Sequence, residues 1–200
     1  MIILGIDTTG PWCSVGLLNG GADKTFTQET RVERSGPGHA ELLAPMVQNI
    51  LHGHNTKPSD IDRIIVCTGP GSFTGVRVGL SFAKGFALPH GIDILGVSAL
   101  EIWAYAADPG AHKDIFSAAD VRRGQVFWQI FSSGKAVGTP VLSSLEDAQN
   151  FCGNMPCAGQ AAHLLTGIES TKPDTCHVDP KALMNWGRDK HAKDYPPTPL

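Results

Sequence analysis

Hydrophobic residues fall in short runs and in one helical stripe over the first hundred residues, and polar turns separate them. The apolar runs at residues 2–7, 63–68 and 93–97 are bounded by Gly, Pro, Asp or Ser, which predicts buried strands. Between 39 and 51, apolar positions recur at i, i+1, i+4, i+5, i+8 and i+9, the stripe of an amphipathic helix. The stripe consists of Leu42, Leu43, Met46, Val47, Ile50 and Leu51. It packs on a sheet, receives a partner helix, or does both in different parts.

Weaker patterns fill the rest of the first half. Strands at 13–18 and 24–30 are separated by a turn signal, so together with the first strand they predict a three-stranded antiparallel meander. The polar, Gly-containing segment 31–38 is expected to be a mobile loop. A helix capped by Ser98 runs to about residue 107 and completes the order β-β-β-α-β-α-β-α.

Segment 69–79, GPGSFTGVRVG, links the strand at 63–68 to a helix predicted at 72–87. Its Gly-Pro-Gly start makes a turn, and Ser72 has the hydroxyl that an N-cap requires. Every fourth residue on one helical face is small: Gly75, Gly79, Ala83 and Ala87. Glycines inside a helix cost roughly 1 kcal/mol each against alanine, so another backbone or a ligand should lie close to this face. The turn is either an anion or nucleotide site at a helix N-terminus or a tight structural turn.

The pattern of strand, Asp, turn and strand recurs after the Asp-Pro-Gly boundary at 108–110. A strand at 115–119 ends at Asp120, and a turn and a second strand follow. The repeat predicts a duplicated fold with a shorter second copy, and therefore domains at 1–108 and 109–200. The remaining elements predicted in this half are strands at 125–131 and 156–158, helices at 144–152 and 180–188, and irregular structure at 193–200.

The composition argues against several classes of function. The 200 residues carry a formal net charge of −3, which argues against a broad electrostatic grip on nucleic acid. No apolar run approaches about 18 residues, so we expect no membrane span, and the N-terminus lacks the features of a signal peptide. Five scattered cysteines fit a reducing compartment, the cytoplasm. Their spacing forms no zinc motif, and we expect no bound metal.

A strand that ends in Asp-Thr-Thr before a hairpin, repeated as a strand that ends in Asp, resembles the actin-like ATPase superfamily. The resemblance implies an α/β, ribonuclease H-like fold of two tandem β-β-β-α-β-α subdomains, the second of them reduced. In that superfamily the two hairpin loops hold nucleotide phosphates, and the aspartates position magnesium. The residues that would face a nucleotide are Asp7, Thr8, Thr9 and Asp120.

Six segments closely resemble the TsaB family of proteins, formerly named YeaZ, within the TsaD and glycoprotease-like group of that superfamily. They are MIILGIDTT (1–9), HAELLAP (39–45), GPGSFTGVRVG (69–79), AKG (83–85), GVSAL (96–100) and DVRRGQVF (120–127). The likeness is good to about residue 131 and loose beyond it. The family's Pro-x-Tyr-x-Arg tail is missing, so we expect a chain that is truncated just short of it.

The resemblance implies a role in placing a threonylcarbamoyl group on adenosine 37 of tRNA. In this system TsaD is the catalytic paralogue and binds metal through a His-x-x-x-His pair on one helical face. The matching positions here hold Ala99 and Trp103, which ligate no metal. We therefore expect a non-catalytic scaffold or activator with no cofactor of its own, in a complex with a TsaD-type subunit, a TsaE-type ATPase and, through the complex, tRNA. Weak binding of ATP or ADP with magnesium in that complex stays open.

The resemblance also implies that TsaB and TsaD pair through the first two helices of their N-terminal halves, and that TsaB alone forms a homodimer by the same surface. The residues expected at this interface are His39, Leu42, Leu43, Met46, Val47, Ile50, Phe73, Gly75, Val76, Gly79, Leu80 and Ala83. The alternatives are a stand-alone actin-fold ATPase or kinase and a peptidase of the glycoprotease type. Against them, the second hairpin presents Val121-Arg122-Arg123 instead of glycine-rich phosphate binders, and the sequence shows no nucleophile–base pair.

Overall fold

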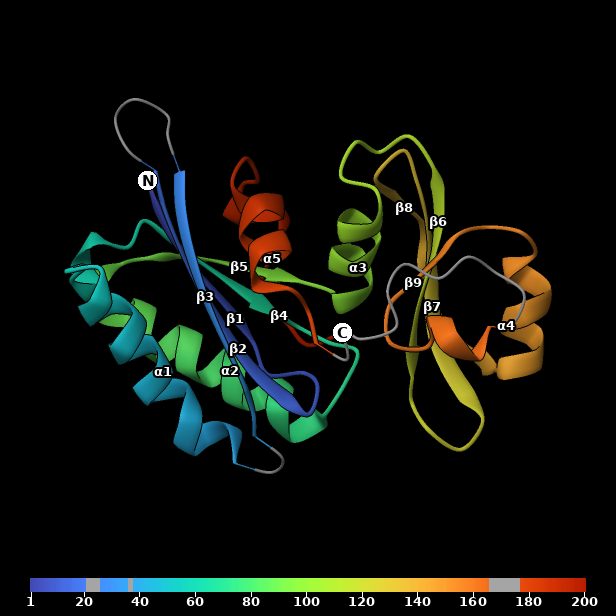
Figure 1. Ribbon diagram of the computed structural model, residues 1–200, viewed down its shortest axis with the longest axis horizontal. Coiled ribbons are helices and arrows are strands. Elements are labelled where there is room, and N and C mark those ends of the chain that lie inside the picture. Colours follow the sequence, from blue (N-terminus) through green and yellow to red (C-terminus); the bar gives the residue numbers. More distant parts are fainter. Residues whose placement is uncertain (21–25, 36–37, 166–176) are drawn as a thin grey trace. The chain divides into compact units, whose positions relative to one another are not determined.

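The computed structural model describes residues 1–20, 26–35, 38–165 and 177–200, and it divides the chain into two α/β units (Figure 1). The first unit comprises Met1–Val97 and His177–Leu200, and the second comprises Ser98–Cys176. This division differs from the boundary expected at 108–109, because the C-terminal segment returns to the first unit. The α/β, actin-like fold class that the sequence predicts is confirmed.

The first unit is built on a five-stranded sheet of order β3-β2-β1-β4-β5. Its strands are β1 (Ile2–Asp7), β2 (Trp12–Gly20), β3 (Phe26–Arg34), β4 (Arg63–Cys67) and β5 (Asp93–Val97). The first three form the antiparallel meander, and the last two join it in parallel. Its helices are α1 (His39–Gly53), α2 (Phe73–Ala87) and α5 (Pro180–Gly187), with 3-10 turns at Pro58–Asp60, Leu88–His90 and Ala192–Asp194.

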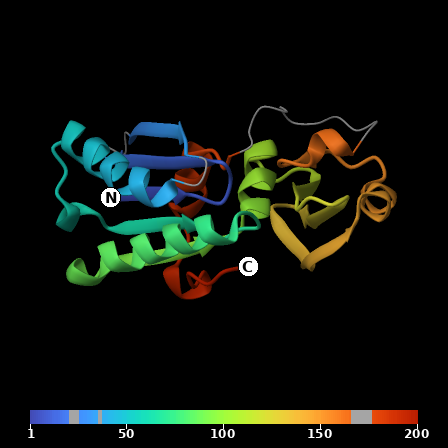
Figure 2. The same cartoon turned by 90° about the horizontal axis from the view of Figure 1, so that it is seen from below.

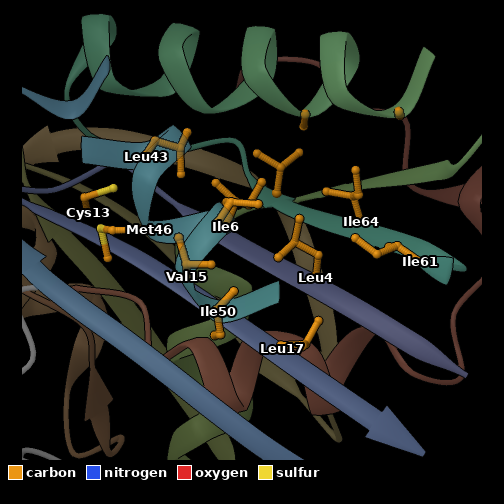
Figure 3. Close-up of a cluster of buried hydrophobic side chains, with 14 of the residues drawn as sticks. Leu4, Ile6, Cys13, Val15, Leu17, Leu43, Met46, Ile50, Ile61 and Ile64 are labelled. Carbon is orange, nitrogen blue, oxygen red and sulfur yellow. The ribbon is translucent and has the colours of Figure 1, made fainter. Parts of the chain in front are cut away.

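Alternation along β1 sends its side chains to two different layers. Leu4 and Ile6 join the buried cluster beneath α1 and α2, whereas Gly5 faces α5 on the opposite side of the sheet (Figures 1 and 3). Figure 3 shows the larger cluster, to which β1, β2, β4 and α1 all contribute. Each fully buried aliphatic side chain in it stabilises the fold by about 1.5–3 kcal/mol. This core therefore fixes the positions of α1 and α2 on the sheet.

The first half of the segment expected to be a loop at 31–38 is instead part of a strand. β3 continues to Arg34 and pairs with β2 from Phe26 opposite Gly20 to Arg34 opposite Trp12. Residues 36–37 lie outside the described residues, as do residues 24–25 of the strand expected at 24–30. Because β3 is an edge strand with mostly exposed side chains, it lacks the buried apolar positions by which strands are recognised.

The second unit repeats the plan on a four-stranded sheet of order β8-β7-β6-β9. Its elements are α3 (Ala99–Ala107), β6 (Asp114–Asp120), β7 (Gln125–Ser132), β8 (Lys135–Ser144), α4 (Leu145–Cys152), β9 (Cys157–Ala158) and a 3-10 turn at Ala162–Leu164. Strand β8 was not predicted from the sequence, because it is an exposed edge strand that contains Gly138 and Pro140. Among the described helices, none has the length and apolar character needed to cross a membrane.

Helix α5 packs on the sheet of the first unit, at two glycines that have no side chain to block it. Gly5 and Gly16 bring the backbone of β1 and β2 close to Met184, which is fully buried. A Cβ added at Gly16 would lie 2.7 Å from the Met184 Cε atom. The helix therefore covers the sheet face opposite α1 and α2, and the first unit has three layers (Figure 1).

We expect Met184→Ala to lower the free energy of unfolding by about 2–5 kcal/mol, because it empties a site between α5 and the sheet. Urea unfolding followed by circular dichroism measures the change. Lys181→Ala is the matched control on the same helix, since that side chain is exposed. Equal unfolding free energies for the two variants would contradict the role of α5 in the first unit.

Candidate functional site

The hairpin between β1 and β2 docks on the N-terminal turn of α2. The Thr8 hydroxyl donates a hydrogen bond of 2.7 Å to the Gly75 carbonyl, and the Ser72 amide donates one of 2.6 Å to the Thr9 carbonyl. The Ser72 hydroxyl accepts from the Gly75 amide, so the predicted N-cap is confirmed. The Gly69–Pro70 peptide bond in the preceding turn is cis.

The glycines of α2 permit this docking. A Cβ at Gly75 would overlap the Thr8 carbonyl, and one at Gly79 would lie 2.5 Å from the Thr8 hydroxyl oxygen. A Cβ at Gly71 would overlap the Thr9 carbonyl oxygen. The backbone that the sequence places against this face is thus the chain's own hairpin, which repays the cost of the helical glycines. Gly85 faces open space, and nothing in the structure explains it.

Most residues expected at a partner interface lie inside the first unit itself. Leu42 is half-buried and Phe73 is 73% exposed. The others are buried within the chain: His39, Leu43, Met46, Val47, Ile50, Gly75, Val76, Gly79, Leu80 and Ala83. His39 also holds the hairpin, through a 2.9 Å contact from its Nε2 atom to the Gly10 carbonyl. These buried side chains shape the helices, and among them Leu43 alone also lines the groove between α1 and α2.

The accessible face is a groove between α1 and α2, which run side by side in Figure 2. The groove has a volume of about 430 Å³. Its lining residues are Ala40, Leu43, Phe73, Thr74, Arg77, Val78, Ser81 and Phe82. The Arg77 guanidinium lies over the exposed Phe73 ring, 4.5 Å from its centroid. Most of these lining residues were not among the expected ones, because they occupy the outward side of the two helices.

Asp7 is enclosed by the chain. Its Oδ1 atom accepts from the Thr9 amide and hydroxyl, at 2.9 and 2.7 Å, and its Oδ2 atom accepts from the Val178 amide at 3.1 Å. Asp7 and Thr8 are fully buried, and Thr9 nearly so. Burial raises the pKa of the Asp7 carboxyl, although the bonds from Thr9 and Val178 oppose the shift. Each carboxylate oxygen therefore accepts at least one hydrogen bond from the chain itself. The nucleotide-facing role that the resemblance gives to Asp7, Thr8 and Thr9 stays a prediction.

The second hairpin differs in chemistry. Asp120 ends β6 as Asp7 ends β1, but it is only half-buried, and its Oδ1 atom accepts from the Arg122 amide at 2.7 Å. Arg122 and Arg123 have positive φ angles of 70° and 58°. The loop is thus a tight turn that exposes two arginines. Asp7 and Asp120 belong to different units, so a shared nucleotide site stays a prediction.

The positions that the resemblance gives to metal-binding histidines lie on α3. Ala99 and Trp103 are both buried there, and Trp103 packs against Gly159. Within residues 1–20, 26–35, 38–165 and 177–200, no three His, Cys, Asp or Glu side chains are placed to hold one metal ion. The described part of α3 thus offers packing groups where a metal centre would require ligands.

Comparison with known proteins gives the geometry a family context. The sequence model of the family described as "TsaD: tRNA N6-adenosine threonylcarbamoyltransferase" matches residues 31–149, more than half of the chain. The tRNA threonylcarbamoyladenosine biosynthesis protein TsaB of Escherichia coli K12 is 40% identical over 130 residues, 64% of this chain and 54% of the relative. TsaB of Bacillus subtilis 168 is 36% identical over 135 residues, 66% of this chain and 55% of the relative. The chain therefore spans about half the length of these curated relatives.

A solved structure, YeaZ from Pseudomonas aeruginosa, resembles the whole chain. It superposes with a TM-score of 0.76 at 26% sequence identity, over 100% of this chain and 98% of the other. The likeness therefore extends over the residues of both units.

The Asp7 carboxyl makes stability depend on pH in a definite direction. Because its folded-state pKa is raised above the ordinary value of 3.8, its contribution to stability is full below pH 3.8 and is lost as the pH rises through the raised pKa. We expect the unfolding free energy of the natural chain, minus that of Asp7→Asn, to fall over this interval. Urea unfolding of both chains at a series of pH values measures the difference. A difference that rises with pH, or stays constant, would contradict the assignment.

Proposed function

We propose that this chain, which belongs to the TsaB (YeaZ) group of the TsaD family, is a non-catalytic scaffold or activator in the modification of tRNA adenosine to threonylcarbamoyladenosine. The target position implied by the family resemblance is adenosine 37. The observation that carries the proposal is the open groove between α1 and α2, on a unit whose hairpin aspartate is enclosed. The chain would work by pairing with a catalytic TsaD-type subunit.

The groove supports pairing by its chemistry. Its lining includes an exposed aromatic ring, Phe73, with Arg77 stacked on it, and aromatic and arginine side chains are enriched among the anchors of protein interfaces. Small residues beside them, Ala40 and Ala44, let a partner helix approach α1 closely. The buried residues beneath hold α1 and α2 rigid, so little ordering is required on binding. The same face would serve a homodimer when the chain is alone.

The side chains on helix α3 and on the first hairpin favour a scaffold role over a catalytic one. Ala99 and Trp103 stand where the catalytic paralogue has its two metal-binding histidines. Both carboxylate oxygens of Asp7 accept hydrogen bonds from the chain itself. The stand-alone ATPase, kinase and peptidase alternatives lack a supporting observation among the described residues. We propose that a TsaE-type ATPase, any ATP or ADP with magnesium, and tRNA join through the complex, in the cytoplasm.

The test is Phe73→Ala, studied by light scattering on a sizing column with the TsaD-type protein of the same organism. We expect the natural chain to give a 1:1 complex at the expense of its homodimer. Removing the aromatic anchor should weaken that complex by about 30-fold or more in Kd, because an anchor residue contributes about 2 kcal/mol or more.

The matched control is Phe26→Ala. Phe26 is also exposed and also carries an arginine on its ring, Arg188 at 4.9 Å, but it lies on β3 and away from the groove. Its loss should leave the complex unchanged. Gly79→Arg is not a useful probe, since it would collide with Thr8 and disturb the fold. Equal affinities for the Phe73 and Phe26 variants would overturn the groove as the pairing surface.

A further inference from the structure

Cys152 and Cys157 lie together in the second unit, where α4 ends and β9 begins. Their sulfur atoms are 3.1 Å apart, and both side chains are buried. Gly153 closes α4 with a positive φ of 53°. Cys157 is fixed from the other side, because β9 pairs it with Phe116 of β6. Two separately anchored elements therefore hold the thiols in contact.

The two thiols are chemically unequal. The hydrogen bond with Cys157 lowers the pKa of Cys152, and the same bond, together with burial, raises the pKa of Cys157. A thiolate attacks an oxidant, whereas a neighbouring thiol that keeps its proton serves to resolve the product. The exposed turn at Gly153 and Asn154 lies directly beside the pair, so a local opening of that turn admits a small oxidant.

The other described cysteines lack this arrangement. Burial raises the pKa of Cys67 well above its ordinary value, and burial together with the Asp7 charge raises the pKa of Cys13 to about 12. Both thiols are enclosed in the first unit beside the hairpin. They stay protonated and serve as internal controls. Cys176 lies outside the described residues.

We propose that Cys152 and Cys157 are a reversible redox modification site, which a hydroperoxide converts to an intramolecular disulfide. The Cys152 sulfur attacks a peroxide oxygen, the oxygen–oxygen bond breaks, and the leaving oxygen departs as water or alcohol with the thiol's proton. The Cys157 sulfur then attacks the Cys152 sulfenic acid, and the hydroxyl leaves with the Cys157 proton as water. The two thiols lose two electrons, which reduce the peroxide, and a dithiol reductant reverses the change.

The disulfide would act on the core of the second unit. Closing the sulfur atoms from 3.1 Å to about 2.05 Å draws the end of α4 toward β9. Trp128 stacks on Phe116 at 4.9 Å and contacts Phe151, the neighbour of Cys152, at 5.3 Å. The emission of Trp128 should therefore change on oxidation and recover on reduction.

The test treats the full chain with hydrogen peroxide, alkylates free thiols under denaturing conditions, and digests the chain after glutamate. Cleavage after Glu146 and Glu169 gives the peptide 147–169, whose cysteines are Cys152 and Cys157 alone. We expect this peptide to be unalkylated and about 2 Da lighter than its reduced form, and to be alkylated twice after dithiothreitol. Oxidation of Met155 adds an oxygen atom and is told apart by mass. Cys13 and Cys67 should remain alkylated throughout.

Two variants separate the steps. Cys157→Ser should leave Cys152 as a sulfenic acid that dimedone traps, and Cys152→Ser should leave position 157 reduced. A pair that stays reduced, a Cys152 that is oxidised beyond sulfenic acid in the natural chain, or a disulfide to Cys176 would each overturn the proposal. If a variant fails to fold, the peptide mass of the natural chain decides alone. No partner protein enters the measurement, so its outcome is independent of the proposed pairing function.

Discussion

The close approach of the Thr8 backbone to helix α2 is the contact on which the first unit depends. It requires glycine at positions 75 and 79, because a side chain at either would strike Thr8. It also fixes the N-terminal end of α2 over the ends of β1 and β4, through bonds that involve Thr8, Thr9 and Ser72. Small residues on a helix are often read as an interface with a partner. Here they are used within the chain, so the surface left for a partner is the outward side of the same helix.

The aspartate of the same hairpin is bound within the fold. Asp7 stands at the end of β1, where the actin-like superfamily places a magnesium-positioning carboxylate. In this structure the amide of Val178, from the segment leading into α5, occupies one carboxylate oxygen, and Thr9 occupies the other. A carboxylate that accepts three hydrogen bonds from its own chain holds the hairpin and α5 together. In this structure the aspartate joins the hairpin to the segment before α5, and this contact supports the scaffold role proposed above.

Local signals were sufficient for much of this architecture. The buried strands, the stripe of α1 and the Ser72 cap follow from patterns within a few residues. Features that depend on contacts between residues far apart in the sequence could not be predicted. Gly75 meets Thr8, which is 67 residues away, and no periodicity says whether a small-residue face turns inward or outward. The edge strands β3 and β8 were shortened or missed because exposed strands lose their alternation. The helix α5 was assigned to the wrong unit because its contacts, Gly5 and Gly16, lie at the other end of the chain.

The thiol pair in the second unit shows how a short-range contact can matter without contributing much to global stability. Cys152 and Cys157 would close only a short loop, and the entropy that a cross-link removes from the unfolded chain grows with loop length. Oxidation should therefore act by displacing the end of α4 against β9 more than by stabilising the unit. Cys157, Phe116 and Trp128 share one buried cluster, and a packed interior transmits a small displacement to its neighbours. The groove between α1 and α2 lies in the other unit, so pairing and thiol chemistry rest on separate sets of contacts and can be altered one at a time.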